Sequence, residues 1–247
     1  MRTMIGASEE QFARMAADVL GEVVANRPDA AIGLPSGRTP LSLYDELARR
    51  VDAGVVDLSA VTAFAIDELY GVPPEHSATN ATYFAERVSS RIPLRALHVM
   101  ASDPPDSDAE CARFARLIED AGGLEIALVG IGRNGHIAFN EPGSPFDSQA
   151  RLVELSDDTR APYIEGFGSL AATPSRGLTL GIADLRAARR VVLVALGAGK
   201  ADIVSQALEG AVTEALPASV LRRHPHLTVV LDQPAGSRLT RWHESFN

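Results

Sequence analysis

Short apolar runs separated by helical patterns are the feature that most constrains the fold of this chain. The runs are rich in β-branched residues and lack alternation between apolar and polar positions; they span residues 30–34, 61–66, 126–131, 191–196 and 227–231. A strand without alternation is covered on both faces, and a helix between two such strands makes a crossover connection. The sequence therefore predicts an α/β fold with a mainly parallel, Rossmann-like open sheet and helices on both faces.

The connecting segments support one continuous domain. Residues 9–25 and 40–50 place apolar side chains three and four positions apart, which predicts helices with one buried face. The proline-rich stretch 103–108 is expected to be a surface connection, and the chain has no internal repeat. We therefore expect a single domain over residues 1–247.

Charge and apolar content exclude several functional classes. The 23 basic and 32 acidic residues give a net charge of −9 with no basic stripe, so nucleic-acid binding is not expected. The longest apolar run, residues 191–196, is far shorter than the roughly 20 residues of a membrane span. The first residues lack the apolar core of a signal peptide, and the lone Cys111 cannot form an internal disulfide. These features predict a cytoplasmic protein.

Polar clusters follow the predicted strands at the edge where open α/β sheets bind ligands. The first cluster contains Ser36, Gly37, Arg38 and Thr39, and it precedes a helix that Pro40 opens. Backbone N–H groups, two hydroxyls and a helix N-terminus then converge on one point, which suits an anion. A simple polar turn in which Thr39 caps the helix explains the same residues.

Asp67 directly follows the second apolar run, so its carboxylate is expected at the end of a strand. Partial burial there raises a carboxyl pKa toward values that suit a general base. Glu68 is expected to point the other way. The alternative is that either acid caps a turn or pairs with an arginine.

A glycine-rich turn in residues 130–143, GIGRNGHIAFNEPG, carries His136 and Glu141 five positions apart. An imidazole moves protons in both directions near pH 7, and an adjacent carboxylate would fix its tautomer. The alternative is a hydrogen-bonded loop histidine. No His, Cys or Asp spacing is typical of a metal site, so we expect neither metal nor cofactor.

Lys200 is the only lysine, because the other 22 basic residues are arginine. A compact ammonium serves where a planar guanidinium does not fit, although chance also leaves single residues behind. Lys200 lies in a short GAGK turn after the fourth apolar run.

These residues together resemble the glucosamine-6-phosphate deaminase/isomerase family, which is related in fold to the 6-phosphogluconolactonases and ribose-5-phosphate isomerases. The segment NGHIAFNEPG follows the deaminase form of the family motif. The segments GLPSGRTP, AFAIDELYGVP and GAGK resemble further family segments in the same order.

The resemblance implies a reaction and roles for individual residues. Asp67 would move a proton between C2 and C1 of an opened amino sugar, His136 would open the ring, and Glu141 and Asn134 would orient and tune His136. The residues expected to bind the phosphate are Ser36, Gly37, Arg38, Thr39, Gly130 and Lys200. The products would be a ketose 6-phosphate and ammonia, formed without a cofactor in N-acetylglucosamine catabolism.

The sequence departs from the family pattern at Glu165, where the family usually has a phosphate-binding arginine. Either Arg38, Arg160 or Arg176 supplies the cation, or the alignment slips, or the substrate is not a hexosamine 6-phosphate. Residues 77–80, with Ser and Asn three apart, resemble the lactonases, and residues 158–173 are expected to form a mobile lid.

Two other functions remain open from the sequence alone. A sugar-phosphate lactonase would use the same histidine to activate water, and a non-enzymatic sugar-binding module would share the fold. A monomer or small homo-oligomer is expected. The sugar epimer is not determined.

Overall fold

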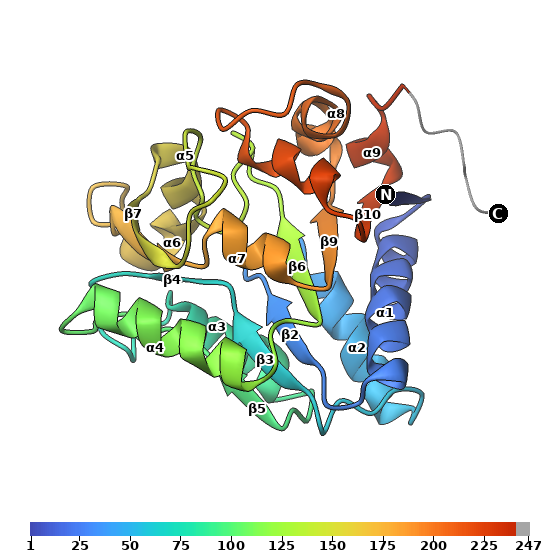
Figure 1. The fold of residues 1–247 in the computed structure, drawn as a ribbon, viewed down its shortest axis with the longest axis horizontal. Coiled ribbons are helices and arrows are strands. Elements are labelled where there is room, and N and C mark those ends of the chain that lie inside the picture. The colour runs from blue at the N-terminus through green and yellow to red at the C-terminus, as the bar shows by residue number, and fades with distance from the viewer. Residues whose placement is uncertain (241–247) are drawn as a thin grey trace.

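The computed structural model describes residues 1–240, which form two sheets (Figure 1). The larger sheet has seven strands in the order β1-β10-β9-β6-β2-β3-β5, and all neighbours are parallel. Its strands are β1 (Arg2–Gly6), β2 (Ala31–Leu34), β3 (Thr62–Ala65), β5 (Ala96–His98), β6 (Ile126–Gly130), β9 (Arg190–Ala195) and β10 (Leu227–Asp232). The predicted α/β class with a mainly parallel sheet is confirmed.

Helices cover both faces of this sheet (Figure 1). One face packs against α1 (Glu9–Asn26), α2 (Leu41–Asp52), α3 (Asn80–Phe84) and the π-helical turn η1 (Ala85–Ser89). The other face packs against α4 (Ser107–Asp120), α7 (Ile182–Ala187), α8 (Ala201–Glu209), the 3-10 helix η4 (Pro217–Arg223) and α9 (Gln233–Gly236). No helix within residues 1–240 is long and apolar enough to span a membrane.

Alternate residues of each central strand serve the two hydrophobic cores, which explains the unbroken apolar runs. In β6, Ile126 and Leu128 belong to the core under α1 and α2, whereas Ala127 and Val129 belong to the core under α4, α7 and α8. All four side chains are at most 1% exposed. A polar residue at any of these positions would place an unsatisfied group inside one core.

A second sheet lies beyond one end of the large sheet and is antiparallel, with the order β4-β8-β7. Its strands are β4 (Asp67–Leu69), β8 (Arg176–Thr179) and β7 (Arg151–Glu154). Three short helices follow β7: α5 (Asp157–Arg160), the 3-10 turn η2 (Ala161–Tyr163) and α6 (Ile164–Phe167). These elements, which the apolar pattern did not predict, enclose a third small core around Leu69 and Phe139.

The start of α2 differs from one sequence-based alternative. The helix begins at Leu41 after Pro40, and no side chain caps it. The interpretation of Thr39 as a helix cap is therefore wrong. Cys111 is buried on α4, as its helical pattern predicted.

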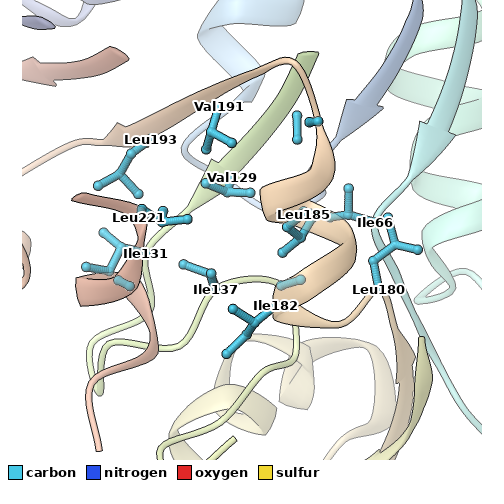
Figure 2. Close-up of a cluster of buried hydrophobic side chains, with 14 of the residues drawn as sticks. Ile66, Val129, Ile131, Ile137, Leu180, Ile182, Leu185, Val191, Leu193 and Leu221 are labelled. Atoms are coloured by element: carbon cyan, nitrogen blue, oxygen red, sulfur yellow. The ribbon is translucent and has the colours of Figure 1, made fainter. Parts of the chain in front are cut away.

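The glycine-rich turn after β6 is anchored by apolar side chains on both sides. Ile131 and Ile137 flank residues 132–136 of this turn and lie in the same buried cluster as Leu185 of α7 and Leu193 of β9 (Figure 2). Ile137 is completely buried, and Ile131 is 5% exposed. The core therefore fixes both ends of the turn that carries His136.

We predict that Ile137→Ala lowers the free energy of unfolding by about 2–5 kcal/mol, because it removes buried methyl groups and leaves a cavity. Urea unfolding followed by circular dichroism measures this change. Val55→Ala is the control, because Val55 is 71% exposed and its truncation is expected to change stability by less than about 0.5 kcal/mol. Equal stability of the two variants would contradict the proposed anchoring.

Candidate active site

Two carboxylates that are adjacent in sequence are buried at the start of β4, just after the end of β3. Asp67 is 6% exposed and Glu68 is fully buried. The Glu68 carboxylate accepts the backbone N–H groups of Leu69, Asn80 and Ala81 at 2.8, 2.8 and 2.9 Å, so it caps the start of α3. Backbone N–H groups therefore occupy the Glu68 carboxylate, which makes Asp67 the candidate for acid–base chemistry.

Asn80 holds Asp67 in place. Its side-chain amide donates to the Asp67 carboxylate at 2.7 Å and to the Asp67 carbonyl at 2.8 Å. Burial, followed by repulsion from Glu68, raises the pKa of Asp67 to about 7, while the hydrogen bond from Asn80 opposes this rise. Asp67 therefore changes charge near neutral pH, as a general base should.

His136 sits against a backbone position that only glycine can occupy. A Cβ atom on Gly132 would lie 2.2 Å from the imidazole ring, and the Gly132 N–H donates to the His136 carbonyl at 2.9 Å. Burial is the main cause that lowers the pKa of His136 to about 4. The imidazole is consequently neutral at pH 7.

Glu141 acts on His136 through a hydroxyl group, not by direct contact as the spacing suggested. The distance from His136 Nδ1 to the nearest Glu141 oxygen is 4.0 Å, whereas Thr159 Oγ1 lies 2.9 Å from His136 Nδ1. The Thr159 hydroxyl is also near enough to the Glu141 carboxylate to lower its pKa. A carboxylate only accepts, so Thr159 donates to Glu141 and accepts from Nδ1–H. This arrangement leaves Nε2 of His136 free to take a proton.

Further hydrogen bonds fix Glu141 itself. Ser156 donates its N–H and its hydroxyl to Glu141, both at 3.0 Å, and the Asn134 amide donates at 2.7 Å. Asn134 also accepts the N–H of His136 at 3.1 Å. The structure therefore brings Asn134, His136 and Glu141 into one network.

The polar turn after β2 faces the same region. Tyr163 lies close enough to both Ser36 and Asp67 for each to affect its pKa: Ser36 lowers it, and the Asp67 carboxylate helps burial to raise it. Gly37 has a φ of +97°, and its carbonyl accepts from Tyr83 at 2.8 Å. Tyr163 thus joins the turn to Asp67.

The loop of His136 meets Asp67 through the small sheet. Thr179 is the register partner of Asp67, and its hydroxyl accepts the N–H of Phe139 at 3.2 Å. The rings of Phe139 and Tyr163 make an edge contact with centroids 6.4 Å apart. Asp67, the turn after β2 and the histidine loop are therefore neighbours.

Cations gather at the adjacent strand ends. The Lys200 ammonium donates to the Ile131 carbonyl at 2.6 Å, one residue beyond Gly130 at the end of β6. Burial, then repulsion from Arg133 and Arg38, lowers the pKa of Lys200. Within residues 1–240, the side chains of Arg38 and Thr39 make no hydrogen bond or ion pair that would withdraw them from a ligand.

The other two arginines considered from the sequence are occupied. Arg160 pairs with Asp157 at 3.0 Å and donates to three carbonyls of residues 170–174. Arg176 stacks over the Tyr70 ring at 4.8 Å. Glu165 is exposed on α6. Of the three arginines, Arg38 remains available for an anion.

Sequence reasoning missed Asn80, Thr159, Ser156 and Tyr163. Asn80 lay in a segment noted only for its resemblance to lactonases. Thr159 and Tyr163 lay in the predicted lid, where the structure has short helices pinned by Arg160 and by a stacked pair, His76 and Phe167, with centroids 4.5 Å apart. No periodic pattern marks these positions, because their partners lie far away in the chain.

A buried carboxylate with a pKa near 7, a partly buried neutral histidine and a polar turn with a cation beside it are the groups expected in an α/β enzyme site that transfers protons. Residues 6–230 match the family model described as glucosamine-6-phosphate isomerases/6-phosphogluconolactonase. The chain belongs to this family, and the resemblance inferred from the sequence is confirmed.

Characterised relatives agree with this assignment. The chain is 40% identical to a glucosamine-6-phosphate deaminase of Bacillus velezensis, over 92% of this chain and 95% of the relative. It is 37% identical to one of Mycolicibacterium smegmatis, over 97% and 93%. The solved structure of a monomeric glucosamine-6-phosphate deaminase superposes with a TM-score of 0.92 at 32% identity, over 96% and 100%. A 6-phosphogluconolactonase of Trypanosoma brucei shares the fold, with a TM-score of 0.75 at 20% identity over 97% and 98%.

We predict that Asn80→Ala moves the acidic limb of the kcat/KM profile upward by about one pH unit, because Asp67 loses the donor that favours its charged form. The backbone N–H of residue 80 is retained, so Glu68 still caps α3. The pH profile measures the shift, and Asn26→Ala, at an exposed position, is the control. An unchanged limb in Asn80→Ala would refute the assignment of Asp67 as the titrating base.

We predict that Thr159→Val lowers kcat/KM on the order of a hundredfold, because His136 loses the group that fixes its tautomer and orientation. Thr159→Ser keeps the hydroxyl and is expected to restore most of the activity. Equal activity of the valine and serine variants would show that the hydroxyl has no role.

Proposed function

We propose that this protein is an amino-sugar phosphate deaminase/isomerase that converts glucosamine 6-phosphate, or a close analogue, to a ketose 6-phosphate and ammonia. The observation that carries the proposal is the placement of Asp67: a buried carboxylate with a pKa of about 7, joined through Tyr163 to the polar turn that would hold the phosphate. The deaminases among its relatives support the same reaction.

Ring opening is the first step, and the neutral His136 suits it. Nε2 takes the proton of the anomeric hydroxyl and delivers a proton to the ring oxygen, so the C1–O5 bond breaks and an aldehyde forms. Glu141, acting through Thr159, stabilises the imidazolium that exists between the two transfers. Asn134 orients both groups.

Isomerisation follows at Asp67. The carboxylate removes the proton from C2 while O1 takes a proton from the ammonium group of the substrate, which gives an enolamine; the resulting carboxylic acid then returns its proton to C1. The product is an imine at C2. Water adds to that carbon, ammonia leaves, and the ketose remains, so no oxidant or reductant is consumed.

The phosphate would bind to Ser36, Gly37, Arg38, Thr39, Gly130 and Lys200. The turn after β2 supplies N–H groups and hydroxyls, and Lys200 supplies a compact positive charge. Within residues 1–240, no group of three or more His, Cys, Asp or Glu side chains is arranged to hold a metal ion. The proposed steps need only proton transfers and one water molecule.

A sugar-phosphate lactonase is the second candidate, and Asn80 favours it because residues 77–80 resemble the lactonase pattern. A neutral His136 would also activate water for attack on a lactone carbonyl. Lactone hydrolysis abstracts no proton from carbon, so it requires no base at Asp67.

The location, pathway and oligomeric state of the protein are also part of the proposal. We infer a cytoplasmic enzyme of N-acetylglucosamine catabolism, built as one domain and active as a monomer or small homo-oligomer. The monomeric state described for one solved deaminase supports the smaller assembly.

We predict that the purified protein releases ammonia from glucosamine 6-phosphate and that Asp67→Asn reduces kcat by at least about a hundredfold, because the amide cannot accept the C2 proton. The rate is expected to rise with pH through about 7 as Asp67 loses its proton. A coupled ammonia assay measures both effects.

Asp52→Asn is the matched control, because Asp52 is exposed at the end of α2. Galactosamine 6-phosphate and unphosphorylated glucosamine test the epimer and the phosphate. Hydrolysis of 6-phosphogluconolactone without ammonia release, unaffected by Asp67→Asn, would replace the proposal with the lactonase.

A further inference from the structure

Three cationic side chains lie on neighbouring loops at the carboxyl edge of the large sheet: Arg38, Arg133 and Lys200. Strands β9, β6 and β2 are adjacent in that order, and each loop follows one of them. Arg38 follows β2, Arg133 follows β6, and Lys200 follows β9. Of the three, Arg133 has no role in the function proposed above.

A hydrogen bond ties Lys200 to the loop of Arg133. The Lys200 ammonium donates to the carbonyl of Ile131 at 2.6 Å, and Arg133 is the second residue after Ile131. Gly132 is fixed by its bond to the His136 carbonyl, and Ile131 is buried in the core. The backbone that carries Arg133 is therefore rigidly placed beside Lys200.

Neither guanidinium is neutralised by a neighbour. Arg38 and Arg133 are both exposed, and neither makes an ion pair within residues 1–240. Both are close enough to Lys200 to lower its pKa. Three positive groups that repel one another in a chain of net charge −9 favour an anion between them.

Glu165 is an exposed carboxylate on α6 and cannot supply this charge. Arg160 and Arg176 are held by other partners. An arginine next to Lys200 would supply a further positive charge for an anionic ligand.

We propose that Arg133 is a specificity-determining residue that binds the phosphate of the substrate together with Lys200 and Arg38. This inference rests on the proposed function for the identity of the substrate. The planar guanidinium makes two parallel hydrogen bonds to phosphate oxygens, and Lys200 neutralises the remaining charge. Arg133 acts on substrate binding and leaves the proton transfers to Asp67 and His136.

The experiment measures phosphate binding and catalysis separately in Arg133→Gln. Calorimetric titration with inorganic phosphate gives the affinity, and steady-state kinetics with glucosamine 6-phosphate gives KM and kcat. We expect Arg133→Gln to weaken phosphate binding and raise KM by roughly ten- to hundredfold, with kcat little changed. Arg133→Lys is expected to recover part of the affinity, because it keeps the charge but loses the planar fork.

Arg190→Gln is the matched control, because Arg190 is exposed at the opposite end of β9 and its loss changes the net charge equally. Wild-type affinity in Arg133→Gln, equal losses in both variants, or no phosphate binding by the wild-type protein would each overturn the inference. Phosphate binding that depends on Arg133 without ammonia release would support it and refute the proposed reaction instead.

Discussion

Burial of the large parallel sheet on both faces is the constraint on which the rest of the structure depends. Alternate residues of β2, β6 and β9 pack into different cores, so the interiors of these three strands have no place for a polar side chain. Polar residues are confined to the strand ends, and parallel strands bring their carboxyl ends to one edge. The turn after β2, the histidine loop after β6 and Lys200 after β9 therefore share one edge because the sheet leaves them no other location.

The same burial sets the protonation states of the site. It raises the pKa of Asp67 and Glu68 to about 7 and lowers that of His136 to about 4. For both acids the folded pKa exceeds the unfolded value near 4, so their contribution to stability is fully present below about pH 4 and is lost as the pH rises through about 7. Between these pH values the folded state loses stability as the two buried acids become charged, which is a common consequence of burying functional groups.

Sequence patterns predicted most strands of the large sheet and the site residues that follow them. They did not predict the small sheet or the residues around it. Apolar runs located five of the seven central strands, and the turns that follow them contained Ser36, Asp67, His136 and Lys200. The edge strands β1 and β5 were missed, since β5 is only partly buried and therefore lacks a continuous apolar run. Thr159 was missed because it reaches His136 across 23 residues, through short helices that carry no periodic signal. Asn80 was missed for the same reason, because its partner Asp67 is 13 residues away.

The strand order of the large sheet also has a consequence for how the chain is made. β10, one of the last elements, lies between β1 and β9, and Arg2–Gly6 pairs in register with residues 228–232. In a chain emerging from the ribosome, α1 can pack against α2 early, but β1 has no strand partner until residues 227–232 have been synthesised. Such long-range pairing slows folding and leaves an exposed strand edge open to other chains. The pairing of β1 therefore waits for β10, and removal of residues 227–240 would leave β1 without its strand partner.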